Sequence, residues 1–153
     1  MGNEIIVRPI GIVRSSVQED VDENWGNVIS EIHLKPEFKG GLNGLAAFSH
    51  VIVASYFHKS TFDIGRDLIR RPQGRADMPM TGIFAQRAKH RPNPLGITAA
   101  RILEIKEGVL VVQGLDAIDG TPVIDLKPYY PAYDLRGDAR VPDWVKVLME
   151  NYF

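Results

Sequence analysis

Apolar and polar residues alternate along this chain in short runs, a pattern typical of β-strands rather than of helices. Residues 5–13 are rich in β-branched side chains, but Pro9 interrupts them, which predicts an edge strand or a bulge. Residues 28–34 alternate more weakly. Residues 51–57 (VIVASYF) form a short apolar run that indicates a buried central strand.

The second half of the chain predicts a meander of hairpins. Its strand candidates are residues 98–105, 109–114, 115–118 and 121–126. The first two flank a turn that ends at Gly108, and the last two flank Asp119-Gly120, a strong hairpin signal. Consecutive antiparallel strands joined by tight turns predict a barrel or a sandwich.

Helix is scarce in the pattern. The best candidate is residues 142–152, where Pro142 suits a first-turn position and apolar side chains recur at helical spacing. Residues 61–81 show little periodicity, and a loop of this length inside a compact domain is usually functional or mobile. We therefore expect a mostly β, single-domain protein with a long central loop and a short C-terminal helix.

Composition narrows the class of protein. A length of 153 residues suits one domain, and the absence of Cys excludes disulfides and thiolate metal sites. The four histidines lack metal-ligand spacing, so we expect no metal site. No signal peptide or run of about 18 apolar residues is visible, and together these features predict a cytoplasmic protein that does not cross a membrane.

The charge is nearly balanced, with a formal net value of −1, which argues against a non-specific nucleic-acid binder. The middle of the chain is nevertheless basic. Its cations are Arg66, Arg70, Arg71, Arg75, Arg87, Lys89 and Arg91, against which only Asp67 and Asp77 stand. This Arg66 to Arg91 stretch is either a site for an anionic partner or a loop with solvated arginines.

Residues 84–96 (FAQRAKHRPNPLG) concentrate unusual features. Cationic donors come from Arg87 to Arg91, and Pro92 and Pro94 fix the backbone on both sides of Asn93. Such a stiff, basic turn is costly unless it positions a ligand. The alternative is a surface turn that uses prolines for stiffness alone.

Two further patterns carry candidate chemistry. Asp125 and Lys127 are two residues apart and so point to the same face of a strand, where they can pair or contact the charged ends of an amino-acid ligand. The neighbouring Tyr129 and other tyrosines can stack on a base or lie near a sulfonium, or else belong to the core. His58 closes the apolar strand and is a candidate ligand contact or a structural residue.

The sequence resembles the TsaA-like (TrmO) family over nearly its whole length. The residues that carry the resemblance are Pro9–Val13, Gly44-Leu45, Phe48–His50, Phe57–Lys59, Gly82–Phe84, Arg87, Arg91–Gly96, Asp119–Pro122 and Asp125–Tyr129. The most specific part is the arginine-proline-asparagine core at residues 91–96. The family includes bacterial enzymes that N6-methylate threonylcarbamoyladenosine-37 of tRNA. Its fold is a β-barrel, its cofactor is S-adenosylmethionine and its members work as dimers.

The resemblance implies a cofactor site. Carried over residue by residue, its contacts are His58, Lys59, Arg87, Ile97, Asp125, Leu126, Lys127 and Pro128. The family also uses a Pro-Arg-Gln-like stretch before the second strand, and this chain has Asp22 to Gly26 there. If that segment keeps its place, Asn24 and Trp25 take over the contact, Trp25 by stacking.

The expected function is methyl transfer from S-adenosylmethionine, with tRNA bound through the Arg66 to Arg91 stretch and a homodimer as the working form. Arg91 and Asn93 would orient the acceptor or the cofactor, and Tyr129 or His90 would be nearest to a proton acceptor. The bacterial enzymes carry a further C-terminal domain, and we expect residues 1–153 to be one barrel domain without it. A methyltransferase of a small molecule and a non-catalytic cofactor-binding module are the alternatives.

Overall fold

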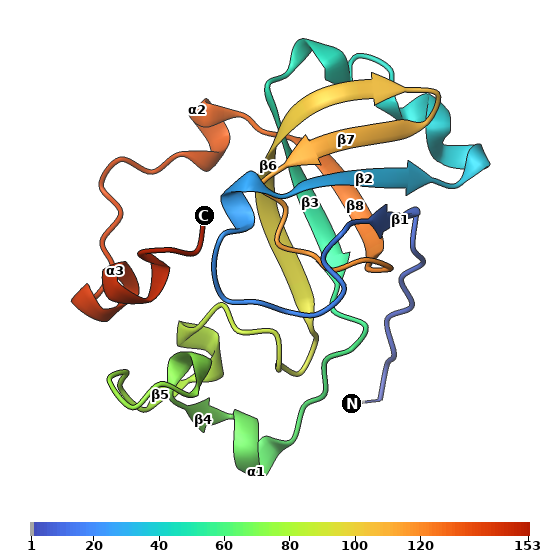
Figure 1. Cartoon of the computed structure of the whole chain (residues 1–153). Coiled ribbons are helices and arrows are strands. Elements are labelled where there is room, and N and C mark those ends of the chain that lie inside the picture. The colour runs from blue at the N-terminus through green and yellow to red at the C-terminus, as the bar shows by residue number, and fades with distance from the viewer. Residues whose placement is uncertain (1) are drawn as a thin grey trace.

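A computed structural model describes residues 2–153 and has a six-stranded, closed antiparallel barrel at its centre (Figure 1). The strands are β1 (Gly11–Arg14), β2 (Ile29–Leu34), β3 (His50–Tyr56), β6 (Leu95–Lys106), β7 (Val109–Gln113) and β8 (Pro122–Pro128). They follow the order β1-β2-β7-β6-β3-β8 around the barrel, and β8 closes it against β1. The predicted fold class, mostly β with an antiparallel barrel, is confirmed.

The helical elements are short and lie outside the barrel (Figure 1). The α-helices are α1 (Ile64–Asp67), α2 (Pro131–Asp134) and α3 (Asp143–Met149), and the 3-10 turns are η1 (Trp25–Asn27), η2 (Pro36–Leu42), η3 (Leu45–Ala47), η4 (Pro72–Gly74) and η5 (Ile83–Ala85). Pro142 caps α3 from outside rather than occupying its first turn. None of the helices described between residues 2 and 153 has the length and apolarity needed to cross a membrane.

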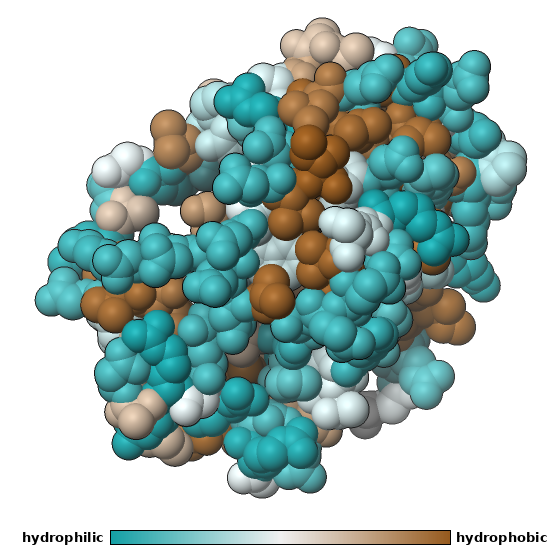
Figure 2. Space-filling view, viewed as in Figure 1, coloured by the Kyte–Doolittle hydropathy of each residue, from teal (hydrophilic) through white to brown (hydrophobic). Residues whose placement is uncertain are grey.

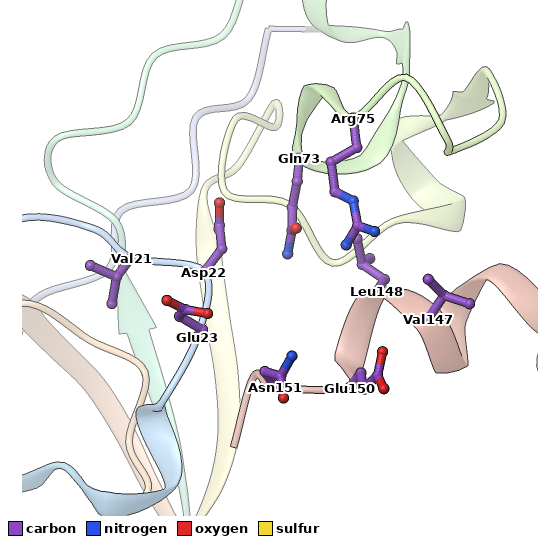
Figure 3. A pocket seen from close by; sticks show the side chains of 9 residues that line it. All are labelled: Val21, Asp22, Glu23, Gln73, Arg75, Val147, Leu148, Glu150 and Asn151. Atoms are coloured by element: carbon purple, nitrogen blue, oxygen red, sulfur yellow. The ribbon is translucent and has the colours of Figure 1, made fainter.

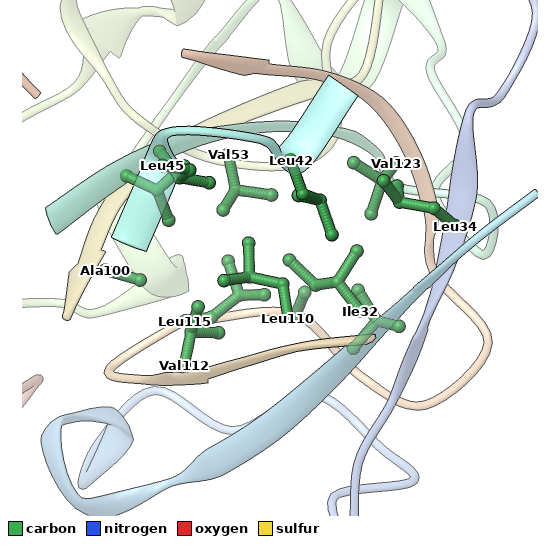
Figure 4. Close-up of a cluster of buried hydrophobic side chains, with 13 residues drawn as sticks. Ile32, Leu34, Leu42, Leu45, Val53, Ala100, Leu110, Val112, Leu115 and Val123 are labelled. Carbon is green, nitrogen blue, oxygen red and sulfur yellow. The ribbon is translucent and has the colours of Figure 1, made fainter. Parts of the chain in front are cut away.

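Strand alternation builds the core. On β3, Val51 and Val53 point inward and are fully buried, whereas Ile52 and Ala54 face outward. Inward positions of the other strands, with Leu42 and Leu45 from the 3-10 turns and Leu115 and Ala117 from the segment before β8, complete the aliphatic cluster that fills the barrel (Figure 4). The interior is therefore a packed core, and ligand contacts from the strands have to come from outward-facing positions or from the barrel ends.

Strand β6 connects two parts of the sheet. Its first half pairs with β3, its second half pairs with β7, and Arg101 has partners on both strands. The predicted hairpin between residues 98–105 and 109–114 is confirmed, because β6 and β7 pair across Glu107-Gly108. The predicted hairpin around Asp119-Gly120 is wrong: residues 115–118 form no strand, and Asp119 Oδ1 accepts a hydrogen bond from Ser15 N (3.0 Å) instead.

The predicted long loop is an excursion from the barrel between β3 and β6. It holds α1 and a small two-stranded sheet, β4 (Ile69–Arg70) with β5 (Thr81–Gly82), at the lower edge of Figure 1. Asp63 begins α1 by accepting a hydrogen bond from Arg66 N (2.9 Å). Residues 61–81 are thus locally ordered rather than an unstructured loop.

Candidate functional site

The outer face of three neighbouring strands brings two predicted cofactor contacts together. Ile97 on β6 and Asp125 on β8 both pair with Ala54 of the intervening β3, so the three side chains form a row across the sheet. Ile97 is 58% exposed, and the small side chain of Ala54 is half-buried. The row offers an apolar surface that ends in a carboxylate.

Lys127 extends this row along β8. It lies opposite Ile52, and its Nζ is 3.0 Å from Asp125 Oδ2, with both side chains largely exposed. The predicted placement of Asp125 and Lys127 on one face is confirmed, and they pair in this structure. Leu126 points the other way and packs against the core, so its contact to a ligand on the outer face would have to come from its backbone.

Arg87 ties the stiff turn to the same strand. Its Nη2 donates to the carbonyl oxygen of Ile97, so the guanidinium lies beside the row. The following residue, Thr98, donates from Oγ1 to Asp116 Oδ1, and the hydroxyl of Tyr152 donates to Asp116 Oδ2 (2.6 Å). Burial, reinforced by the negative charge of Asp116, raises the pKa of Tyr152 well above its ordinary value.

Sequence reasoning missed Thr98, Asp116 and Tyr152. Asp116 sits inside the apolar stretch 115–118, where an isolated acid is unusual. A buried or half-buried carboxylate needs partners. That rule could have marked Asp116 as a residue with a defined role, although its partners are distant in sequence.

Asn24 and Trp25 lie in a segment that packs on residues 151–153. Trp25 is 2% exposed and its indole N–H donates to Val21 O (2.8 Å), so its ring has no face open to a cofactor in this structure. Asn24 is exposed and has a positive φ of 62°. The predicted stacking by Trp25 would require the segment to rearrange, whereas a contact from Asn24 would not.

His58 and Lys59 lie at the end of the barrel where β3 finishes. Together with Asp20, Lys89 and Thr121 they line a small cleft. Lys89 pairs with Asp20, and Lys59 Nζ lies 3.6 Å from Glu19 Oε1. Both predicted contacts are thus at the same end of the barrel as the turn that precedes β6.

The stiff turn itself is held by its own side chains. Arg91 Nη1 donates to the carbonyl oxygens of Gln86 (2.8 Å) and Ala88 (3.0 Å), which makes its guanidinium a brace for the turn. His90 Nδ1 lies 2.9 Å from Thr61 O and 3.2 Å from Ser60 Oγ. Asn93 is exposed, and its side chain makes no hydrogen bond to any of residues 2–153.

Tyr129 lies at the opposite end of the barrel. Its backbone N–H donates to His50 O (3.1 Å), and its ring is 6.1 Å from the His50 ring. The antiparallel register places Leu95, close to Asn93, opposite Tyr56, at the other end of β3. Six residues of strand span about 20 Å. Within one chain, Tyr129 therefore lies far from Arg91 and Asn93. The three residues expected to share a catalytic site do not come together in a single chain.

The basic stretch is engaged within the chain at every cation. Arg66 Nη2 (2.6 Å) and Arg70 Nη1 (3.3 Å) pair with Asp67, and Arg75 Nη2 pairs with Asp77 (2.6 Å). Arg71 caps a carbonyl oxygen of Met78. Asp67 is completely buried, and its hydrogen bonds from Arg66 and from the Asp63 backbone hold its pKa well below the usual range. These arginines stabilise the excursion, and they still leave it with more cations than carboxylates.

A larger cleft of about 420 Å³ opens between the excursion, the segment before Trp25 and α3 (Figure 3). Its walls are Val21, Asp22, Glu23, Gln73, Arg75, Val147, Leu148, Glu150 and Asn151. Sequence reasoning did not find this cleft, because its walls come from three distant segments. Within residues 2–153, no group of three or more His, Asp or Glu side chains is arranged to hold a metal ion.

Comparison with known proteins identifies relatives of this chain. A family model described as the tRNA-methyltransferase O N-terminal domain matches residues 21–135. A probable S-adenosyl-L-methionine-binding protein of Methanothermobacter thermautotrophicus is 40% identical over 138 residues, which cover 88% of this chain and 96% of that protein. The tRNA (adenine(37)-N6)-methyltransferase of Mus musculus is 41% identical over 93 residues, covering 61% of this chain and 21% of that protein.

A solved structure agrees with the fold. The crystal structure of TrmO from P. aeruginosa superposes with a TM-score of 0.76 at 32% sequence identity, over 94% of this chain. The chain spans 63% of the length of that structure.

Proposed function

This chain belongs to the tRNA-methyltransferase O N-terminal domain family, and from that premise we propose that it is an S-adenosylmethionine-dependent methyltransferase that N6-methylates threonylcarbamoyladenosine-37 of tRNA. The observation that carries the proposal is the row of Ile97, Ala54 and Asp125, flanked by Lys127 and Arg87. Acceptance of tRNA as substrate would place the enzyme in the cytoplasm.

The residues in this row fit the cofactor. S-adenosylmethionine combines a flat adenine with a ribose and an amino-acid end that carries an ammonium and a carboxylate. Ile97 and Ala54 offer an apolar surface for the adenine, and the exposed pair of Asp125 and Lys127 offers one charge of each sign for the amino-acid end. Arg87 adds a donor beside Ile97.

When bound, the cofactor supplies an electrophilic methyl group on a sulfonium. The chain's own residues have to align the acceptor nitrogen and take up its proton. Asn93 is exposed on a backbone stiffened by two prolines, and Arg91 braces the same turn. His90 lies beside them, whereas Tyr129 does not.

His90 is therefore our choice for the proton acceptor within one chain. Its Nδ1 is engaged within the chain, 2.9 Å from Thr61 O, 3.3 Å from Thr61 N and 3.2 Å from Ser60 Oγ. Its other ring nitrogen, Nε2, makes no hydrogen bond to residues 2–153 and would be the atom that accepts the proton. A role for Tyr129 would require a second copy of the chain to bring it to the turn.

A homodimer is part of the proposal. Beyond Ile97, the outer face of β6 exposes Leu95 and Leu103, and Tyr56 of β3 lies beside Leu95. Figure 2 shows hydrophobic side chains gathered in a band over β6 and β7 on the visible face. An apolar band of this kind on a barrel exterior fits a subunit contact. Light scattering after size exclusion tests it, and a monomer at micromolar concentration contradicts it.

The decisive experiment supplies labelled S-adenosylmethionine with bulk tRNA that carries or lacks the threonylcarbamoyl group. We expect label in N6-methylated threonylcarbamoyladenosine from the first tRNA and none from the second. Cofactor binding without transfer to either tRNA contradicts the proposal. That outcome would favour a binding module, as the name of the Methanothermobacter relative suggests for that protein, or a small-molecule methyltransferase.

A further inference from the structure

Residues 151–153 join two parts of the proposed cofactor site that are far apart in sequence. On one side, Asn24 N donates to Asn151 O and Trp25 N donates to Tyr152 O, each at 2.8 Å. Two consecutive backbone bonds fix both the position and the register of this contact. Residues 24 and 25, which the family resemblance assigns to cofactor contacts, are thus held by residues 151 and 152.

On the other side, the same segment reaches strand β6 through a single carboxylate. Tyr152 donates its hydroxyl hydrogen to one oxygen of Asp116 (2.6 Å), and Thr98 donates to the other oxygen. Thr98 directly follows Ile97, whose carbonyl oxygen accepts from Arg87. Asp116 therefore links residue 152 to the strand position that offers the proposed cofactor surface.

The electrostatics agree with this arrangement. Burial is the main cause that raises the pKa of Tyr152, the negative charge of Asp116 raises it further, and the positive charge of Arg87 acts in the opposite direction. Arg87 and Asp116 are thus both within electrostatic reach of the phenol. The phenol stays neutral and serves as a hydrogen-bond donor to the carboxylate.

Gly26 and the backbone of Phe153 are tightly packed. A Cβ added at Gly26 would lie 2.6 Å from the carbonyl carbon of Phe153 and 3.2 Å from its Cα. Backbone atoms cannot yield in the way that a flexible side chain can. The absence of a side chain at residue 26 is what allows residues 151–153 to lie against the 24–26 segment.

We propose that residues 151–153 form a wall of the cofactor site, and that Asp116 and Tyr152 are positioning residues that hold the 24–25 segment at a fixed place relative to Arg87 and Ile97. This inference rests on the proposed function. Asp116 and Tyr152 act through the residues they hold and do not themselves touch the methyl group.

The test compares three variants with matched controls in the full chain. Tyr152→Phe removes one donor, Asp116→Asn removes the charge, and Gly26→Ala displaces residue 153. Their controls are Tyr133→Phe, Asp143→Asn and Gly41→Ala, all at exposed positions, with open space around Gly41. Calorimetry with S-adenosylmethionine gives Kd, and steady-state kinetics with tRNA give KM and kcat.

We expect each of the three variants to raise Kd and KM for S-adenosylmethionine by about tenfold, the effect of losing one hydrogen bond to a charged group. Tyr152→Phe removes that bond and Asp116→Asn weakens it, whereas Gly26→Ala displaces the backbone of residue 153. Because Asp116 and Tyr152 act on the cofactor site alone in this proposal, kcat at saturating cofactor should change less than threefold. The controls should match wild type. An unchanged Kd in all three variants contradicts the proposal that residues 151–153 form a wall of the cofactor site, and it leaves the proposed function unaffected. Wild-type protein that binds no S-adenosylmethionine overturns both.

If a variant does not fold, the proposal can still be tested by a measurement on the wild-type chain. Saturation with S-adenosylmethionine should slow hydrogen exchange at the Trp25 amide, because that amide donates to Tyr152 O. The amides of residues 109–111, next to the β6–β7 turn and away from Gln113, whose side chain donates to Gly26 O (3.1 Å), should show little change. Equal exchange at Trp25 with and without the cofactor contradicts the proposal.

Discussion

The ring of Phe57 lies directly against Gly96: a Cβ at residue 96 would stand 2.5 Å from Phe57 Cζ and 2.9 Å from Ser55 Oγ. Phe57 N also donates to Pro94 O (2.8 Å). The residue that follows β3 therefore seats the stiff turn that opens β6. This contact gives the glycine at the end of the arginine-proline-asparagine core a packing reason.

We predict that Gly96→Ala destabilises the protein by about 1–3 kcal/mol, the usual cost of overpacking a filled site. The added methyl group has to push the Phe57 ring or the turn away. Denaturant unfolding followed by fluorescence measures the change. Gly137→Ala, with nothing within 4 Å of the added carbon, is the control and should stay close to wild type.

Replacing Arg91 or Asn93 by alanine should have different effects on stability and on activity. Arg91 braces two carbonyl oxygens of the turn, so Arg91→Ala should lower both the melting temperature and methyl transfer. Asn93 is exposed, and none of residues 2–153 bonds its side chain, so Asn93→Ala should lower methyl transfer by about 100-fold with an unchanged melting temperature. Full activity of Asn93→Ala would remove Asn93 from the site.

Asp67 should make the excursion sensitive to acid. Its pKa is lowered in the folded state, chiefly by the hydrogen bonds from Arg66 and then from the Asp63 backbone, against an ordinary value of 3.8. The stabilisation is therefore complete above that ordinary value and is lost as the pH falls below it toward the folded pKa. Amide exchange in residues 63–86 should accelerate below about pH 4 in wild type.

Asp67→Asn is the comparison for this acid effect. It leaves Arg66 and Arg70 without a charged partner, so its excursion should already exchange rapidly at pH 7. Its exchange should then change little between pH 7 and pH 4 after correction for intrinsic rates. A variant as well protected as wild type at pH 7 would show that the buried carboxylate is dispensable.

Tyr152 should produce the opposite dependence at high pH. Its pKa is raised in the folded state, first by burial and then by Asp116, above an ordinary value of 10.0. Its stabilisation is present below that ordinary value and is lost as the pH rises through it toward the folded pKa, because only the unfolded phenol then ionises. The free energy of unfolding should fall more steeply above about pH 10 in wild type than in Tyr152→Phe.

Tyr133→Phe provides the reference for this alkaline effect. Tyr133 is exposed, so its removal should leave the steep fall in place. Parallel pH profiles for wild type and Tyr152→Phe would show that folding does not raise the pKa of Tyr152.

Local signals in the sequence were sufficient for most of the barrel. The apolar run at residues 51–57 and the turn at Gly108 predicted β3 and the β6–β7 hairpin because both depend on neighbouring residues. The hairpin at Asp119-Gly120 failed because long-range contacts decide residues 115–118. Asp116 there serves Thr98 and Tyr152, whose positions no local pattern encodes.

The candidate site shows the same division. The shared face of Asp125 and Lys127 follows from strand alternation and was predictable, and the family resemblance is confirmed by the match to residues 21–135. The strand register that separates Tyr129 from Asn93 could not be predicted from the sequence, because it depends on which strands pair and in which direction. The partners of the basic stretch were likewise hidden: Lys89 pairs with Asp20, 69 residues away in the sequence.

The filled interior of the barrel has a consequence for how the protein can vary. Along β3, one set of alternating positions holds the core and the other set faces outside. Substitutions at Ala54 or Ile97 can thus change what the surface binds while the free energy of unfolding stays nearly constant. A deep mutational scan for binding and for abundance should show two tolerance profiles along each strand that are offset by one residue. New ligand preferences could then arise here without a compensating change in the core.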